Sequence, residues 1–222
     1  MTFGDTLRLV LAPPHEAGRP FIVGGVIAIV IGWFFAGWLA WLALIFVLLC
    51  LFFFRDPERV PPGRSSAILA PADGRVMSVA PATPPTELGL GSIPRWRISI
   101  FLSILDVHVN RVPVTGVVTR IAHRHGSFTI ATSDQASEEN ERNAIAIRLG
   151  DGRDLVVVQI AGMIARRIVC YLREGDTVHA GARFGIIRFG SRTDLYLPEG
   201  IRPLVAEGQT MIGGETVIAE LG

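Results

Sequence analysis

The chain contains no lysine, so all 21 of its basic residues are arginine. A pyridoxal phosphate enzyme needs a lysine for its Schiff base, and the phosphate loop of a nucleoside triphosphatase needs one too. A biotinyl or lipoyl carrier would need a lysine to hold its arm. These classes are therefore excluded. Nucleic-acid binding is not expected either, because the formal net charge is +1 and the arginines are scattered.

Cysteine is scarce, with two residues in the whole chain. Cys50 lies within an apolar run, whereas Cys170 lies in the more polar remainder, so we expect no disulfide between them. Free cysteines are compatible with a reducing compartment.

Charge is absent from residues 20–54, which form one long apolar run. About 20 apolar residues cross a bilayer as a helix, so the run predicts either one long tilted helix or two short helices in a shallow hairpin. A signal peptide is disfavoured because its apolar core is shorter and ends at a small-residue cleavage site. Arginines flank the run on both sides, so the charge bias is weak. A hairpin would place both flanks, and the remainder of the chain, on the cytoplasmic side of the cell membrane.

The remainder predicts a mainly β domain. From Ala67 onward, short apolar stretches such as RISIFLSIL and DLVVVQIAG are separated by Gly, Pro and Asp, a pattern typical of a β-sandwich or barrel. We divide the chain into a polar segment (1–19), a membrane anchor (20–54), a linker (55–66) and this domain (67–222). The polar stretch 132–143 is expected to be an exposed loop.

A weak internal repeat relates REGDTVHAGARFGII (173–187) to AEGQTMIGGETVIAE (206–220). Both segments have glycines at matching positions on either side of a short apolar stretch. The pattern indicates a turn, a short strand and another turn, as in the strand motifs of biotinyl- and lipoyl-type domains.

Three short motifs are candidates for chemistry: PADGRV (71–76), ILDVHVNRVP (104–113) and FGSRTDLYLP (189–198). Each also has a purely structural explanation. Asp-Gly and Gly-Ser are ordinary turn dipeptides, and a histidine between two valines can be a strand residue with a satisfied hydrogen bond.

Taken in this order behind an apolar anchor, the motifs resemble those of phosphatidylserine decarboxylases, in particular the short bacterial and archaeal subfamily. The resemblance covers nearly the whole chain and includes the RDPxR linker and the REGD segment. It implies that the chain cuts itself between Gly190 and Ser191. The resulting β chain (1–190) and α chain (191–222) would stay together as a heterodimer of interleaved strands, and longer relatives commonly pair further into homodimers.

The resemblance also implies the reaction. Ser191 Oγ would attack the Gly190 carbonyl, β-elimination would cut the chain, and residue 191 would become a covalent pyruvoyl group, the cofactor of the enzyme. This group would form a Schiff base with the amine of phosphatidylserine in the membrane and act as an electron sink while CO2 leaves, giving phosphatidylethanolamine. Archaetidylserine is an alternative substrate, and a non-catalytic membrane-anchored β-barrel adaptor is an alternative function. A serine hydrolase is disfavoured because the chain has no GxSxG motif.

His108 and Asp73 match the family's assisting groups. A histidine transfers protons near neutral pH, and a carboxylate can orient it and stabilise its charged form. Longer relatives carry a second histidine where this chain has Arg111, and an arginine cannot act as a base at neutral pH. Either His108 alone serves both self-cleavage and decarboxylation, or another group shares the work. Arg111 and Arg192 are candidates for binding the carboxylate or phosphate of the substrate.

The remaining histidines do not predict a metal site. His123 and His125 would point to the same side of a strand, but no cysteine or third histidine lies near them in the sequence. His15 and His179 are expected at the surface.

Overall fold

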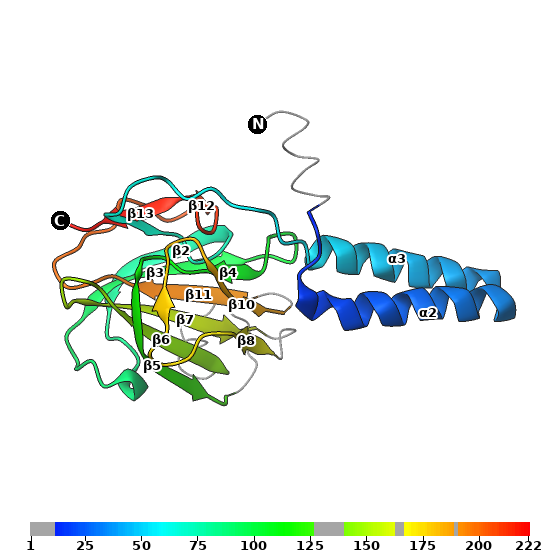
Figure 1. Cartoon of the computed structure of the whole chain (residues 1–222), viewed down its shortest axis with the longest axis horizontal. Coiled ribbons are helices and arrows are strands. Elements are labelled where there is room, and N and C mark those ends of the chain that lie inside the picture. The colour runs from blue at the N-terminus through cyan, green and yellow to red at the C-terminus, as the bar shows by residue number, and fades with distance from the viewer. Residues whose placement is uncertain (1–11, 127–139, 163–166, 189–190) are drawn as a thin grey trace. The chain divides into compact units, whose positions relative to one another are not determined.

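The computed structural model describes residues 12–126, 140–162, 167–188 and 191–222. The chain divides into two compact units, Met1–Glu58 and Arg59–Gly222. The first unit is a hairpin of two apolar helices, α2 (Arg19–Phe35) and α3 (Gly37–Phe53), after a short 3-10 turn, η1 (Glu16–Gly18). Figure 1 shows α2 and α3 side by side. The two-helix alternative predicted from the apolar run is therefore the one observed.

The helices reverse direction at Ala36, whose φ of −161° and ψ of 114° interrupt the helical conformation. Glycines let the two helices approach closely. A Cβ at Gly25 would lie 2.5 Å from Val47 Cγ2, and a Cβ at Gly32 would lie 2.7 Å from the Ala40 nitrogen. Such close packing of small residues is common between apolar helices in membranes.

The outward surface of the hairpin is apolar. Many large hydrophobic side chains on it are more than half exposed, including Trp33, Phe34, Phe35, Trp38 and Trp41. Among the described residues, Glu16–Phe35 is the one helical segment long and apolar enough to cross a membrane, and α3 is shorter. Length and composition are the basis of this assignment.

The expectation that His15 lies at the surface was wrong. His15 is 7% exposed because it caps the turn that starts the hairpin. Its Nδ1 accepts a hydrogen bond from the Ala17 N–H at 3.2 Å. The backbone N–H of His15 donates to the Phe54 carbonyl at 2.7 Å. This hydrogen bond connects the start of the hairpin to its end. His179 is exposed, as predicted.

The second unit is mainly β, as predicted. Its described residues form an eight-stranded antiparallel sheet in the order β12-β2-β3-β11-β7-β6-β5-β9, a three-stranded sheet β4-β10-β8 and a pair β1-β13. Figure 1 labels strands of all three sheets. The strands are β1 (Ala67–Leu69), β2 (Gly74–Ala82), β3 (Arg95–Leu102), β4 (Val109–Arg111), β5 (Gly116–Arg124), β6 (Arg142–Arg148), β7 (Asp154–Ala161), β8 (Ile168–Cys170), β9 (Thr177–Val178), β10 (Arg183–Ile187), β11 (Ser191–Tyr196), β12 (Thr210–Met211) and β13 (Val217–Glu220). A short 3-10 helix, η2 (Thr86–Leu88), precedes β3.

The main core lies between the large sheet and the two smaller sheets. Alternate residues of the large sheet, such as Ile98, Ile145 and Leu195, pack there against Ile68 of β1 and Phe184 of β10. We call this side of the large sheet its inner face. A second cluster, which includes Leu88 of η2, covers the outer face.

The described part of the polar stretch 132–143, residues 140–143, is not an exposed loop. Residues 132–139 lie outside the described residues, but β6 already begins at Arg142. Asn140 is fully buried, and its Nδ2 donates to the Ala161 carbonyl at 2.8 Å. Composition alone misplaced this boundary, because these polar side chains are paired inside the domain.

The large sheet consists of two matching halves. The order β12-β2-β3-β11 on one side corresponds to β9-β5-β6-β7 on the other. The bulge between Val76 and Ser78 in the β2–β3 pair has its counterpart between Val118 and Arg120 in the β5–β6 pair. Each residue of β2 therefore corresponds to the residue of β5 whose number is 42 higher. Each residue of β3 corresponds to the residue of β6 whose number is 47 higher.

The internal repeat predicted from the sequence is part of this correspondence. Each copy contains a two-residue strand, β9 or β12, followed by a tight turn and a longer strand. Glycines with positive φ lie at equivalent positions: Gly175 (93°) and Gly208 (87°), then Gly181 (81°) and Gly214 (79°). Because other residues rarely adopt such a conformation, the glycine spacing was the detectable part of the repeat.

Candidate active site

Ser191 is the first residue of β11, which lies between β3 and β7 in the middle of the large sheet. It is paired with Leu102 on one side and with Ala161 on the other. Its side chain is fully buried, and its Oγ has no hydrogen-bond partner among the described residues. A buried hydroxyl without a partner costs about 1–3 kcal/mol. Such a group marks Ser191 as a candidate reactive residue. Gly190 lies outside the described residues.

The side chains of β11 alternate between the two faces of the sheet. Leu195 belongs to the inner-face core, so Ser191 and Thr193, at the alternate positions before it, also face inward. Arg192 and Asp194 therefore face outward. The Arg192 guanidinium is fully buried there, with Nε 2.6 Å from Asp194 Oδ1 and Nη2 2.7 Å from Ser99 Oγ. The structure thus places Arg192 on the opposite face from Ser191, within a buried ion pair.

His108 is fully buried immediately before β4. The Ile187 N–H of β10 donates to the His108 carbonyl at 3.4 Å. Ile187 packs in turn against Ala161, the residue paired with Ser191 on β7. This chain of contacts brings the backbone of His108 to the end of the sheet where Ser191 lies.

The His108 ring is oriented by a turn. Its Nδ1 lies 2.9 Å from the Asp106 carbonyl oxygen. A carbonyl can only accept, so in the neutral ring Nδ1 carries the proton and Nε2 carries the lone pair of a base. The Asp106 carboxylate accepts the Ser103 N–H at 2.7 Å. Asp106 therefore holds the turn.

A row of buried amides follows Ser191 on the inner face. Gln159 of β7 accepts from Asn143 Nδ2 at 3.0 Å and donates to Asn110 Oδ1 of β4 at 2.8 Å. Thr193 is paired with Gln159 across β11 and β7. Thr193 Oγ1 and Asn110 Nδ2 have no partner among the described residues. Ser191 is thus one of three buried polar side chains that face the interior with unused hydrogen-bonding capacity.

Sequence reasoning missed this row. The one available signal was a polar residue inside an apolar strand, such as Gln159 in DLVVVQIAG. Cys170 of β8 lies beside the row, and burial is the main cause of its raised pKa. Its thiol therefore stays protonated at neutral pH and is not a competing nucleophile. Neither cysteine forms a disulfide, as predicted.

Asp73 lies in the turn before β2. Its Oδ1 accepts the Gly213 N–H at 2.7 Å, and its Oδ2 lies 2.6 Å from Arg59 Nη2. The matching turn in the other half has Thr115, whose Oγ1 accepts the Ala180 N–H at 3.1 Å. One carboxylate oxygen of Asp73 therefore has a structural role that a threonine also performs. Compared with a threonine, an aspartate at this position adds the ion pair with Arg59.

Arg111 is the last residue of β4 and is 4% exposed. Its Nη1 donates to the Gly181 carbonyl at 3.1 Å. A Cβ at Gly214 would come within 2.7 Å of Arg111 Cδ. Arg111 therefore packs between the two glycine turns of the internal repeat.

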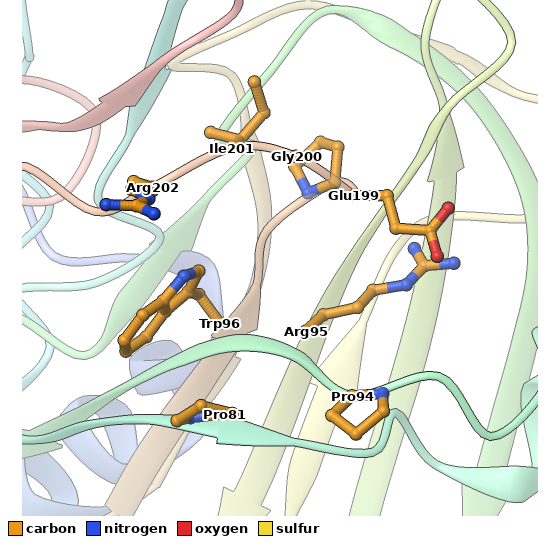
Figure 2. A pocket seen from close by; sticks show the side chains of 9 residues that line it. Pro81, Pro94, Arg95, Trp96, Glu199, Gly200, Ile201 and Arg202 are labelled. Atoms are coloured by element: carbon orange, nitrogen blue, oxygen red, sulfur yellow. The ribbon is translucent and has the colours of Figure 1, made fainter.

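A surface pocket of about 260 Å³ lies at the other end of β11 (Figure 2). Its lining residues come from the end of β2, from the start of β3 and the residue before it, and from the segment after β11: Pro81, Pro94, Arg95, Trp96, Pro198, Glu199, Gly200, Ile201 and Arg202. The Leu197 N–H donates to the Trp96 carbonyl at 2.9 Å, which fixes the pocket beyond the last residue of β11. This pocket is therefore not the surroundings of Ser191.

Comparison with known proteins identifies the family. Residues 46–219 match the family model described as phosphatidylserine decarboxylase. A phosphatidylserine decarboxylase proenzyme of Granulibacter bethesdensis is 67% identical over 221 residues, covering 100% of this chain and 91% of that protein. Proteins of the same name from Gluconobacter oxydans and Gluconacetobacter diazotrophicus are 55% and 56% identical over 225 residues, with 100% of each chain covered.

The chain is thus an enzyme of the decarboxylase class. It belongs to the phosphatidylserine decarboxylase family, as its motifs predicted. The family assignment decides against the non-catalytic adaptor.

Proposed function

We propose that this protein decarboxylates phosphatidylserine to phosphatidylethanolamine after cutting itself between Gly190 and Ser191. Family membership supports the substrate, since the relatives carry this activity and the word proenzyme in their names. The structural observation that carries the proposal is the buried hydroxyl of Ser191 at the start of the central strand, which has no hydrogen-bond partner among the described residues. Archaetidylserine, which carries the same serine headgroup, remains the alternative substrate.

Self-cleavage follows from the chemistry of a Gly-Ser bond. Ser191 Oγ loses its proton to a base and attacks the Gly190 carbonyl carbon, and the amide nitrogen leaves with a proton to give an ester. Removal of the Ser191 Cα proton then breaks the Cβ–Oγ bond and releases residues 1–190 with a carboxylate end. Water adds to the remaining dehydroalanine, and ammonia leaves to give the pyruvoyl group. No oxidant or reductant is required.

The residues around Ser191 suit a pyruvoyl group. The site is buried, and on the same interior side Thr193 Oγ1 and Asn110 Nδ2 are polar atoms that have no partner in the described part of the chain. When present, this group supplies an electrophilic carbonyl that holds the substrate amine and accepts electron density as CO2 leaves. His108, with its base nitrogen at Nε2, is the proposed proton carrier. Asp73 is the proposed supporting carboxylate, and Arg111 and Arg192 are the proposed ligands of the substrate's charged groups.

Among these assisting groups, the contacts support His108 most strongly. Its backbone lies at the Ser191 end of the sheet, through Ile187 and Ala161. Asp73 has its own partners in Arg59 and Gly213. Arg192 faces outward within its ion pair with Asp194, and Arg111 packs between the two glycine turns.

The apolar hairpin is the proposed membrane anchor. Its exposed side chains are apolar over α2 and α3, and a lipid substrate requires the enzyme to work at a bilayer. The hairpin has both of its ends tied together at His15 and Phe54, so both flanks would be on one side, the cytoplasmic side of the cell membrane. The mature protein would be a heterodimer of its own β and α chains, and we propose that these pair further into a homodimer.

Intact mass spectrometry tests the central step. The wild-type protein should give two chains split at residue 190, and the smaller should be lighter than a serine start requires. Ser191→Ala should give one full-length chain and no phosphatidylethanolamine from phosphatidylserine vesicles. Ser78→Ala, in the bulge of β2, is the matched control and should still be cut. A single uncut wild-type chain that forms phosphatidylethanolamine would refute the pyruvoyl proposal and leave the substrate assignment standing.

A further inference from the structure

A group of potential metal ligands lies two to three strands away from β11, at β6 and β5. His123 of β5, His125 just after β5 and Glu141 just before β6 each offer a ligand atom, and these atoms all lie within 4.8 Å of one another. His123 Nε2 is 3.7 Å from Glu141 Oε1. The two imidazole rings are 4.8 Å apart and nearly perpendicular. Glu141 was invisible to sequence reasoning because it precedes the next strand, far from the two histidines.

Strand pairing explains why the three side chains converge. His123 is paired with Asn143, and Arg124 with Arg142. Continuing this register by one step places His125 opposite Glu141, and residues two apart on one strand share a face. Asn143 donates to Gln159 on the inner face. The three ligand residues therefore occupy the same face as Ser191, at the same end of the sheet.

The matching half of the sheet shows that the fold does not require these residues. The positions that correspond to His123 and Glu141 are Pro81 and Pro94, by the offsets of 42 and 47 residues. Figure 2 shows both prolines lining the pocket at the other end of β11. Proline side chains have no atom that can bind a metal. The same offset of 42 places Thr83 at the position of His125. The three positions therefore hold two prolines and a threonine in one half, and two histidines and a glutamate in the other.

We propose that His123, His125 and Glu141 bind a divalent transition-metal cation of the Zn²⁺ type. Two imidazole nitrogens and one carboxylate oxygen are ligands that zinc commonly takes, and three protein ligands leave a coordination position for water or an anion. In a tetrahedral site the ligand atoms lie about 3.4 Å apart, at zinc–ligand distances of about 2.0–2.1 Å. His123 is 38% exposed along its side chain, so a small rotation can bring the atoms to that spacing.

The site can be tested on the full-length protein in detergent, purified without a histidine tag. Zn²⁺ is titrated in competition with a chromophoric chelator, and Co²⁺ is titrated with its visible absorption as the readout. We expect one equivalent of each metal to bind. His125→Ala and Glu141→Ala should each weaken Zn²⁺ binding by at least about tenfold. The matched control is His179→Ala, an exposed histidine in the same unit, which should bind as the wild type does.

The Co²⁺ spectrum separates this site from cysteine binding. We expect ligand-field bands without the sulfur-to-metal charge-transfer band that a Cys170 thiolate would give. The proposal is overturned if the wild type binds less than one equivalent, if His125→Ala binds as tightly as the wild type, or if His179→Ala weakens binding equally. Metal binding does not require residue 191 to react, so Ser191→Ala should bind Zn²⁺ unchanged even if the proposed function fails.

Discussion

The buried pair of Arg192 and Asp194 allows the role of Arg192 to be decided by experiment. The side chains of the two residues are 2% and 1% exposed, and the guanidinium contacts both carboxylate oxygens, at 2.6 and 3.1 Å. Asp194→Asn keeps the shape of the side chain but removes its charge, which takes the paired carboxylate away from the buried Arg192 cation. Breaking a buried pair in this way costs about 3–5 kcal/mol. We therefore expect a loss of that size in the free energy of unfolding.

The measurement is urea unfolding in detergent, followed by circular dichroism, in a Ser191→Ala background so that every variant is a single chain. The double variant Arg192→Met/Asp194→Leu removes both charges and should be more stable than Asp194→Asn alone, because neither charge is then buried without its partner. Arg148→Ala breaks an exposed pair with Asp154 and is the control. It should leave the unfolding midpoint unchanged.

Two results would refute this reasoning. One is a loss below about 1 kcal/mol for Asp194→Asn, which would mean that the Arg192 charge is solvated or otherwise compensated. The other is a double variant no more stable than the single one. Substrate binding by Arg192 would show in kinetics rather than in stability. If Arg192 binds the substrate, the variant Arg192→Met/Asp194→Leu, made in the self-cleaving protein, should stay folded and have a higher KM for phosphatidylserine.

Three further predictions concern His108, Asp73 and Tyr196. His108→Ala should slow self-cleavage by at least about 100-fold, the low end of a general base contribution, as measured by the rate at which the two chains appear on a denaturing gel; cleavage at the wild-type rate would eliminate His108 as the base. Asp73→Asn should keep the hydrogen bond to the Gly213 N–H and lose the ion pair with Arg59. Asp73→Ala should lose both and be less stable than Asp73→Asn by about 1 kcal/mol, the net contribution of one hydrogen bond, in urea unfolding. Burial raises the pKa of Tyr196 to about 12, above the value of about 10 for an exposed tyrosine. The folded state therefore holds this proton more tightly, and stability should fall by up to about 3 kcal/mol between about pH 10 and pH 12; Tyr196→Phe should remove that part of the pH dependence.

Local patterns in the sequence predicted the elements well. The uncharged run 20–54 predicted helices, and the alternating stretches after Ala67 predicted a β domain. The glycine spacing predicted the repeat, because a positive φ is a local requirement that glycine meets at least cost. What the apolar run alone could not show was the break at Ala36, since alanine does not ordinarily end a helix.

The candidate site was predictable only in part. Ser191, His108 and Asp73 were predicted from motifs, but their partners depend on pairing between strands far apart in the sequence. Asn110 contacts Gln159, and Glu141 contacts His123. Predicting these contacts would require knowing the strand order and register. The outward position of Arg192 follows from the alternation of side chains between the two faces of a strand, once β11 is known to include Arg192 and Leu195 is known to face inward. Its proposed contact with the substrate stays a prediction, which the KM measurement tests.

The central position of β11 has a consequence for how the mature enzyme persists. If the chain is cut before Ser191, the strand in the middle of the large sheet belongs to the short α chain, while its neighbours β3 and β7 belong to the β chain. The precursor folds as one molecule. After the cut, refolding would require the unfolded α and β chains to meet, a second-order process. The strands of the α chain pair only with strands of the β chain, so the α chain could not form a sheet alone. Self-cleavage would then make folding a one-time event. The lifetime of the cut enzyme would depend on its rate of unfolding rather than on a folding equilibrium. Heat inactivation should therefore be irreversible for the cut, active enzyme, whereas the uncut precursor could still refold.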